Sequence, residues 1–424
     1  MKLAMLILAA LVGAAAPALA ADASQVQAGN TAWVLTASAL VLFMTLPGLA
    51  LFYGGLVRAR NLLSVLMHCF VICCVVSLLW AICGYSLAFT GEGGLLGGAG
   101  RLFLGGMTER NGLPEGVFAL FQMTFAIITP ALVIGAFPER VTFPFVILFS
   151  ALWLLVVYVP VAHWVWGGGW AAQWGVLDFA GGIVVHTTAG AAALVAALVI
   201  GHRSGFPHVA PPHSPGLTMT GAGMLWVGWF GFNGGSALAA DGAAAGAILA
   251  THLAASTGAL TWLAVEWIKV GKPTSIGIVT GCVAGLATIT PASGYVGPGG
   301  AIAIGAVGGI VCFFATVTVK QRLRIDDSLD VFAVHGVGGM LGSALVALFA
   351  LPALGGAGLA GGMGWTRQLG VQLAAIAAAG IWSALAAWAI IRALMALGEV
   401  RVGEDVEYDG LDLATHGERA YDHT

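Results

Sequence analysis

The sequence predicts an all-α membrane protein with eleven transmembrane helices, arranged as an inverted five-plus-five repeat with a pore at the repeat interface. Composition is the first reason. Hydrophobic residues make up 59% of the chain and charged residues 8%, whereas a soluble domain carries about 25% charged residues. The second reason is a series of apolar stretches close to the roughly 20 residues that a helix needs to cross a bilayer. The third is a pair of motifs that recur five stretches apart.

The N-terminus has the pattern of a cleaved secretory signal. Residues 1–20 combine Lys2, an apolar core and small residues at Ala18 and Ala20, an arrangement typical of such signals. The alternative is an uncleaved first span. Cleavage predicts a mature N-terminus outside the membrane, a membrane domain over 21–397 and a polar cytoplasmic regulatory tail over 398–424.

Eleven apolar stretches follow the signal, and an odd number of crossings from outside places the C-terminus in the cytoplasm. Basic residues support this orientation in the cell inner membrane, because twelve of the 16 Lys and Arg fall on the predicted inner side and three on the outer side. The predicted spans lie near 31–55, 62–90, 116–137, 142–163, 181–201, 217–238, 244–268, 276–292, 299–319, 331–350 and 368–397.

The remaining composition excludes several classes of protein. The net charge of −3 predicts no nucleic-acid surface, and the chain has no phosphate-binding glycine loop. No CxxC pair occurs, so we expect no metal site, no disulfide and no cofactor. We also expect no enzymatic activity, because no nucleophile motif accompanies Ser236. The six cysteines are Cys69, Cys73, Cys74, Cys83, Cys282 and Cys312.

Two motif pairs predict the internal repeat. HTTAGAAALV in the fifth stretch is similar to HGVGGMLGSALV in the tenth, and the Phe52 segment FYGG is similar to the Phe232 segment FNGG in the sixth. Because each copy holds an odd number of spans, the second copy runs inverted, a common plan in transporters with the substrate path at the repeat interface. The eleventh span stands outside the repeat.

His186 and His335 lie inside the fifth and tenth stretches, where an ionisable group usually marks a pathway or a proton relay. At 1.5 Å per helical residue, His186 lies roughly 12 Å beyond Asp178 and His335 roughly 8 Å beyond Asp330. Both imidazoles can therefore meet near the middle of a core of about 30 Å, and the surrounding glycines allow close helix approach. The alternative is two separate histidines, each hydrogen-bonded within the bundle.

Aromatic residues gather at the predicted outer mouth, together with Ser236. Ring faces attract a cation with about 2 kcal/mol or more once water is excluded, and a hydroxyl oxygen accepts a hydrogen bond from an N–H donor. Such a site suits a small hydrogen-bonding cation, whereas hard metal ions prefer oxygen cages. The alternative for the tryptophans is an interfacial aromatic belt. The rings are Phe121, Phe125, Trp164, Trp166, Trp170, Trp229 and Phe232.

Eight segments between the first span and the tail carry a family resemblance. They are ALFYGGLVRARN, the Phe121–Phe125 segment, AHWVWGGGW, LDFAGGIVVH, GWFGFNGGS, TPASGY, DDSLDVFAVHGVGG and GLDLATHGERAY. In sequence and in order, these segments resemble the ammonium transporter family (Amt/MEP/Rh), especially its bacterial Amt branch.

The resemblance implies a homotrimer with one pore in each protomer, and ammonium or methylammonium as substrate. It implies that Trp166, Phe125 and Ser236 form the outer ammonium site, and that Phe125 and Phe232 form a gate. It further implies that His186 and His335 are the twin-histidine pair of the pore. Asp178 matches a carboxylate with a structural and electrostatic role near the outer site; capping of the fifth helix is an equally good account.

Desolvation predicts the mechanism. A bare cation in a narrow apolar tube lacks the hydration that it had in water, whereas neutral ammonia avoids most of that penalty. Ammonium would therefore lose its proton before the hydrophobic stretch, which potassium cannot do. The imidazole pair would offer ammonia a hydrogen-bond partner or relay the proton.

Two positions depart from the expected pattern. Thr280 stands where relatives often carry serine, and Pro130 falls inside the third span, where it can kink the helix. The tail matches the family segment at Gly410, Leu411, Asp412, His416, Gly417 and Tyr421. This match implies docking of a PII-type nitrogen signal protein at the cytoplasmic face, and the alternative is a disordered, solvated tail.

Three competing functions belong to other classes. A potassium-type channel needs a carbonyl filter, and SGYVGPGG lacks the TVGYG order. An intramembrane hydrolase built on Ser236 and a histidine has no supporting motif. The third alternative is an ammonium sensor that signals through a PII-type partner with little flux. Sensors commonly carry an appended domain, so the short segment 398–424 favours transport.

Overall fold

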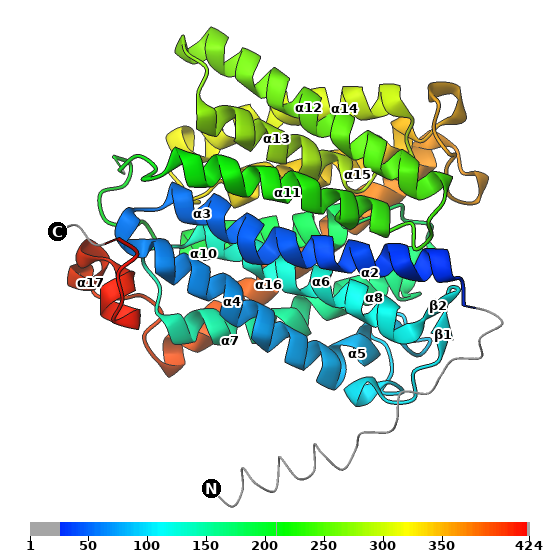
Figure 1. The fold of residues 1–424 in the computed structure, drawn as a ribbon, viewed down its shortest axis with the longest axis horizontal. Coiled ribbons are helices and arrows are strands. Elements are labelled where there is room, and N and C mark those ends of the chain that lie inside the picture. Colours follow the sequence, from blue (N-terminus) through cyan, green and yellow to red (C-terminus); the bar gives the residue numbers. More distant parts are fainter. Residues whose placement is uncertain (1–25, 209, 422–424) are drawn as a thin grey trace, which may run out of the picture.

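The computed structural model describes residues 26–208 and 210–421, and the predicted signal 1–20 lies outside them. Figure 1 shows the long helices side by side in one bundle, with α17 at one end and strands β1 and β2 at the other. The α-helices are α2 (Ala28–Phe43), α3 (Ala50–Leu56), α4 (Leu62–Leu79), α5 (Tyr85–Phe89), α6 (Glu115–Val133), α7 (Phe143–Trp153), α8 (Val159–Trp166), α9 (Trp170–Gln173), α10 (Thr188–Ile200), α11 (Pro215–Gly235), α12 (Gly242–Val270), α13 (Ser275–Ile289), α14 (Pro298–Val317), α15 (Val337–Phe349), α16 (Trp365–Leu397) and α17 (Glu404–Asp409).

Short helical turns and one hairpin complete the described chain. The strands β1 (Glu109–Arg110) and β2 (Leu113–Pro114) pair antiparallel. The π-helical turns are η1 (Met44–Leu49), η3 (Trp80–Gly84), η6 (Leu154–Tyr158), η7 (Gly182–Thr187), η8 (Thr318–Arg322), η9 (Phe332–Gly336) and η12 (Asp412–His416). The 3₁₀ turns are η2 (Ala59–Asn61), η4 (Leu102–Leu104), η5 (Ile134–Ala136), η10 (Pro352–Leu354) and η11 (Ala360–Gly362).

Within the described residues, nine helical segments are long and apolar enough to cross a membrane. The predicted stretches 217–238 and 276–292 correspond to α11 and α13. Helix α13 is shorter than the other segments, and α11 is rich in glycine and threonine. These findings establish a multi-pass helical membrane protein, and the count of eleven spans stays a prediction.

The lipid-facing surface agrees with this class. Large apolar side chains are exposed on the outer faces of the peripheral helices, including Ile268 at 80% and Leu385 at 61%. Contiguous apolar surface of this kind marks contact with lipid or another protein. Pro130 does not interrupt its helix, because α6 runs unbroken from Glu115 to Val133.

The two histidine segments cross at the centre of the bundle, where η7 and α10 pack against η9 and α15. Their backbones touch at glycines. A Cβ added to Gly190 would lie 2.2 Å from Gly336 Cα, and one added to Gly339 would lie 2.6 Å from the Gly182 carbonyl oxygen. Only glycine permits this approach, which brings His186 and His335 to the same depth.

Candidate functional site

His186 and His335 face each other at this crossing. Their Nδ1 atoms lie 3.2 Å apart and their ring centroids 5.2 Å apart. Both side chains are buried, and each lies in a π-helical turn that leads into an α-helix. Turns of this type occur frequently at functional sites. One imidazole must donate through Nδ1 and the other accept, so the tautomers of the pair are coupled.

A small space of about 10 Å³ adjoins both imidazoles, enough for about one water molecule at most. Its remaining wall is aliphatic or aromatic, with Val185, Ile128 and Trp229 among its residues. The Trp229 indole is already engaged, because its Nε1 donates to Thr290 Oγ1 at 2.8 Å. The histidine nitrogens therefore supply most of the hydrogen-bonding capacity of a narrow apolar passage.

Two phenyl rings close this space on the side of β1 and β2. Phe125 and Phe232 are fully buried, with centroids 4.2 Å apart and planes inclined by 35°. The Phe232 centroid lies 6.2 Å from the His186 ring. Because Phe232 lines the small space and Phe125 lines a larger cavity beyond it, the ring pair forms the wall between the two.

The larger cavity, here called the outer cavity after the predicted orientation, has a volume of about 290 Å³. It brings Phe125, Trp166 and Ser236 together, as the sequence predicts. The Trp166 ring stands edge-on to Phe125 at 5.9 Å, and its Nε1 donates to the Asp178 carbonyl oxygen at 2.8 Å. The Ser236 hydroxyl donates to the Phe232 carbonyl at 2.8 Å, which leaves its oxygen lone pairs able to accept.

Other aromatic residues of the sequence hypothesis have different roles. Phe121 packs edge-on against Phe125, with ring centroids 4.9 Å apart, and does not line the outer cavity. Trp164 and Trp170 pack against each other with tilted rings and centroids 5.8 Å apart, and the Trp164 Nε1 donates to the Leu95 carbonyl at 2.8 Å. Neither tryptophan lines the outer cavity, so both act in packing.

Sequence reasoning missed some residues of the outer cavity. Gln122 lines it, is 9% exposed, and its Oε1 has no hydrogen-bond partner within 26–208 and 210–421. An amide directly after Phe121 in an apolar helix was the available signal. Arg110 also lines the cavity, with its guanidinium 4.8 Å from the Phe118 ring.

Asp178 caps the segment that carries His186. Its carboxylate accepts four backbone N–H bonds, from Gly181 at 3.0 Å, Gly182 at 2.6 Å, Ile183 at 2.8 Å and Val184 at 3.0 Å. Both oxygens are engaged and the side chain is buried. This geometry supports the capping role, because the carboxylate satisfies the free N–H groups at the helix start.

The capping aspartate of the second histidine segment is Asp327, which corrects the sequence-based placement of that helix start at Asp330. His335 follows Asp327 by as many residues as His186 follows Asp178, and Asp327 Oδ2 accepts from Phe332 N at 2.7 Å. Asp330 adopts a left-handed backbone with φ of 62° and pairs with Lys320 at 2.8 Å. The choice was ambiguous in sequence, because Asp327 and Asp330 lie only three positions apart and both precede the apolar stretch.

Below His335, toward α17, lies an inner cavity of about 520 Å³. His335 borders both this cavity and the small central space. Asp330, Lys320 and Thr280 also line it, so the Thr280 position belongs to the passage. The outer cavity, the phenyl pair, the histidine pair and the inner cavity thus follow one another through the bundle.

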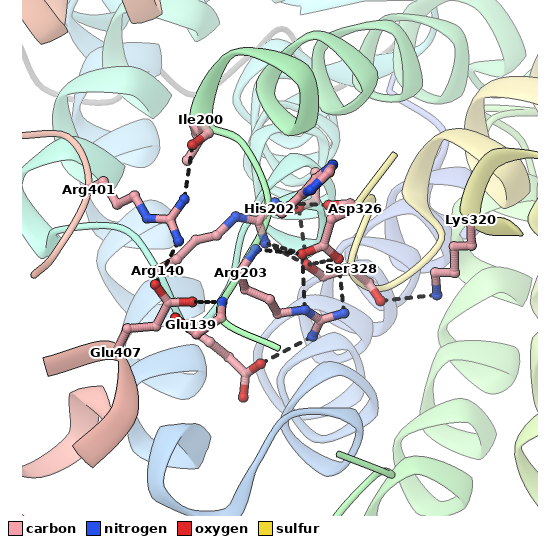
Figure 2. Close-up of polar contacts among 12 residues, drawn as sticks. Glu139, Arg140, Ile200, His202, Arg203, Lys320, Asp326, Ser328, Arg401 and Glu407 are labelled. Carbon is pink, nitrogen blue, oxygen red and sulfur yellow. Dashed lines mark hydrogen bonds and ion pairs between the residues drawn. The ribbon is translucent and has the colours of Figure 1, made fainter. Parts of the chain in front are cut away.

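An ion-pair network ties the loops around the inner cavity together (Figure 2). Arg203 lies at its centre, with Nη1 3.1 Å from Glu139 Oε2 and Nη2 3.0 Å from Asp326 Oδ1. Arg58 Nε donates to Glu139 Oε1 at 2.9 Å. Burial alone would raise the pKa of Glu139, but the charges of Arg203 and Arg58 lower it overall.

The tail packs onto this network. Arg401 Nη2 lies 2.7 Å from Glu407 Oε2, and Arg58 donates to the Glu407 carbonyl at 2.8 Å. The Asp412 carboxylate accepts from the backbone N–H groups of Leu63 at 3.0 Å and Ser64 at 2.8 Å, at the start of α4. The described part of the tail is therefore folded against the membrane domain, unlike the solvated alternative.

The fold and this line of cavities define a multi-pass membrane protein with a narrow apolar passage. The chain belongs to the Ammonium Transporter Family, whose model matches residues 32–421, so the resemblance inferred from the sequence is confirmed. It is 46% identical over 407 residues to an ammonium transporter of Aquifex aeolicus (strain VF5), with 95% of each chain covered.

Solved structures of the family superpose closely on this fold. Mep2 of Candida albicans matches with a TM-score of 0.83 and 37% identity, over 90% of this chain and 88% of that one. A protein described as "Sensor Amt Protein" matches with a TM-score of 0.85 and 30% identity, over 92% of this chain and 98% of that one.

Proposed function

We propose that the protein draws ammonium into the outer cavity, that the ammonium gives its proton to water there, and that neutral ammonia passes between Phe125 and Phe232 to the twin histidines. Family membership supports ammonium as the substrate. The observation that carries the route is the small central space, which has both imidazoles in its wall and is closed by the two phenyl rings.

Recruitment rests on ring faces and one hydroxyl. Trp166 is held by its bond to the Asp178 carbonyl, and with Phe125 it offers aromatic surface to a cation, worth about 2 kcal/mol or more in a dehydrated site. The Ser236 oxygen can accept a hydrogen bond from an N–H group of ammonium, while the Ser236 hydroxyl still donates to the Phe232 carbonyl oxygen. No carboxylate lines this cavity among the described residues, so a hard metal ion finds no suitable ligand cage.

Selectivity follows from the size of the central space. The central space has room for about one water molecule, which is too few to hydrate a cation. An unhydrated charge in apolar surroundings is strongly disfavoured. Ammonium crosses as ammonia after loss of its proton. Potassium has no proton to lose and is excluded at the phenyl pair.

The histidine pair then hydrogen-bonds the ammonia. Its Nδ1–Nδ1 bond fixes one donor and one acceptor, and the buried His186 Nε2 has no partner within the described residues. That nitrogen is available to ammonia in the central space. The pair supplies polar contacts in the middle of a passage that is otherwise apolar.

The remaining architecture follows the same proposal. Eleven spans form an inverted five-plus-five repeat after removal of 1–20, and three protomers assemble in the lipid of the inner membrane. The N-terminus lies outside and the tail in the cytoplasm. A PII-type signal protein docks at the α17 end, where the tail and the loops of the network meet.

Electrical current and ammonia flux, measured together on the reconstituted protein, test this function. We expect ammonium-dependent flux that saturates and is not supported by potassium. His186→Ala is the test variant, and Leu385→Ala, on the exposed face of α16, is the control. A wild-type protein that is inserted correctly and carries no ammonium would contradict transport.

The similarity to "Sensor Amt Protein" favours one second candidate, an ammonium sensor with little flux that signals through a PII-type partner. The same measurement separates the two. A sensor would bind ammonium, as a change in tryptophan fluorescence at the outer cavity, without saturable flux.

A further inference from the structure

The two capping aspartates are used differently. Asp178 has both oxygens occupied by four backbone N–H groups. Asp327 occupies the matching position before His335, yet its Oδ1 has no hydrogen-bond partner within 26–208 and 210–421 although the side chain is 0% exposed. A buried polar atom without a partner is uncommon and needs an explanation.

Asp330 likewise has one carboxyl oxygen without a hydrogen-bond partner in the described chain. Its Oδ2 lies 2.8 Å from Lys320 Nζ, while its Oδ1 is buried and also lacks a partner in the described chain. The Asp330 side chain is 19% exposed and lines the inner cavity together with His335. Its backbone is held at φ of 62°, in the left-handed region that Asp adopts more readily than most non-glycine residues.

Lys320 is the cation that pairs with this site. Its Nζ lies 2.8 Å from Asp330 Oδ2, and Figure 2 shows it beside the loop that carries Ser328. Other charged groups of the described chain also lie close by. Arg140 and Arg203 pair with Asp326 of the same loop. The Tyr53 phenol of α3 lies close enough to interact with both carboxyls, and its hydroxyl already donates to the Leu132 carbonyl at 3.1 Å. Burial and the neighbouring charge of Asp330 raise the pKa of Asp327 to about 7, against a smaller opposing effect of Lys320.

One shared proton resolves both anomalies. Two like charges in a buried site disfavour double ionisation, and a protonated carboxyl can donate to a neighbouring carboxylate oxygen. The pair would then carry one negative charge, which Lys320 balances. Asp327 lies on the buried side of the pair, and Asp330 lies on the side of the cavity.

We propose that Asp327 and Asp330 form a proton-sharing site at the inner end of the passage, and that this site protonates ammonia as it leaves the twin histidines. The inference rests on the proposed function. In the step, a carboxyl O–H bond breaks and an N–H bond forms, which gives ammonium and a doubly ionised pair. A proton from the bulk solution, carried by water in the inner cavity, then returns to the pair. Ammonium, once hydrated, does not re-enter the apolar space.

Infrared difference spectra of the full-length protein in lipid, recorded against pH without substrate, test the proton-sharing site directly. Wild type should show a protonated-carboxyl signal that disappears as pH rises through about 7, above the range in which ordinary carboxyls ionise. Asp327→Asn keeps an oxygen that can accept from Phe332 N, and it should lose the signal. Asp330→Asn should shift the signal to lower pH, because the like charge is removed. Asp409→Asn, exposed on α17, is the control and should keep it.

The transfer of a proton from the carboxyl pair to ammonia, called the hand-over below, is tested by ammonium flux in the same vesicles at different internal pH. In wild type, release should fall as internal pH rises through about 7, and this dependence should vanish in Asp327→Asn. Absence of the infrared signal in wild type, or its persistence in folded Asp327→Asn, overturns the proton-sharing site. A normal signal with unchanged pH dependence in Asp327→Asn overturns the hand-over. Absence of any wild-type flux overturns the proposed function itself.

Discussion

His335 Nδ1 lies 3.2 Å from His186 Nδ1, although 149 positions separate the two residues in sequence. The bond joins the two halves of the chain inside an apolar wall. Since each ring needs the other to satisfy its Nδ1, removal of either leaves a buried imidazole nitrogen without a partner. The pair therefore acts as a unit, and its two members should give similar phenotypes.

Replacing His186 or His335 with alanine should change ammonium flux by about tenfold, which corresponds to about 1.4 kcal/mol in the barrier, and should reduce discrimination against potassium. Flux of both ions in proteoliposomes is the measurement. His252→Ala is the control, because His252 lies on the exposed side of α12 beside Trp226. Wild-type flux and discrimination in an inserted double alanine variant would remove the histidines from the mechanism.

Trp166→Leu should weaken apparent ammonium affinity, by about tenfold for each 1.4 kcal/mol of cation–π attraction lost. Ser236→Ala should weaken it less, through one lost hydrogen bond. Half-saturation of ammonium and methylammonium uptake measures both effects. Trp164→Leu is the matched control, because that indole packs on Trp170 away from the cavity. Unchanged half-saturation in the Trp166 and Ser236 variants would assign those residues to packing.

Asp178→Ala should lower the free energy of unfolding by about 2 kcal/mol or more, because several buried N–H groups lose a charged acceptor. Thermal unfolding in detergent gives the shift. Asp241 offers a matched control, since it caps α12 at an exposed site through Ala243 and Ala244. Asp241→Ala should cost about 1 kcal/mol. Equal effects of the two substitutions would contradict the special weight of the Asp178 cap.

Acid should weaken the ion-pair network around Arg203 through Glu139. The folded-state pKa of Glu139 is lowered from 4.5, so its contribution to stability is present above pH 4.5 and is lost as pH falls through the lower folded-state value. The stability difference between wild type and Glu139→Gln, followed by thermal unfolding against pH, should shrink in that acidic range. Glu404→Gln, exposed on α17, should show no such trend. A difference that grows on acidification would contradict the network.

Asp412→Ala should release the tail, because the N–H groups of Leu63 and Ser64 lose their acceptor. Limited proteolysis of 404–424 should accelerate several-fold, and binding of the organism's PII protein should weaken. Asp409→Ala, on the exposed side of α17, is the control. The binding assay varies adenine nucleotides and 2-oxoglutarate. If wild type forms no complex under any of these conditions, the tail serves another purpose.

Short sequence motifs predicted the residues of the site more completely than they predicted the contacts of the residues around it. Phe125, Trp166 and Ser236 were identified because each belongs to a distinctive segment, and all three line one cavity. Trp164 belongs to the same HWVWGGGW segment as Trp166, yet its indole nitrogen donates to the Leu95 carbonyl. Gln122 was missed because a single amide in an apolar helix is an unusual residue there but does not by itself show which cavity it lines.

The sequence by itself determined the membrane class, the position of most spans, the family and the identity of the paired histidines, because hydropathy and short motifs are properties of neighbouring residues. Only the tertiary structure decided which aspartate caps the segment of His335, how closely Gly190 and Gly336 approach, and where the tail packs. These features depend on contacts between segments that are distant along the chain. A buried carboxyl is satisfied or left without a partner by the backbone that reaches it, and local sequence does not specify that geometry.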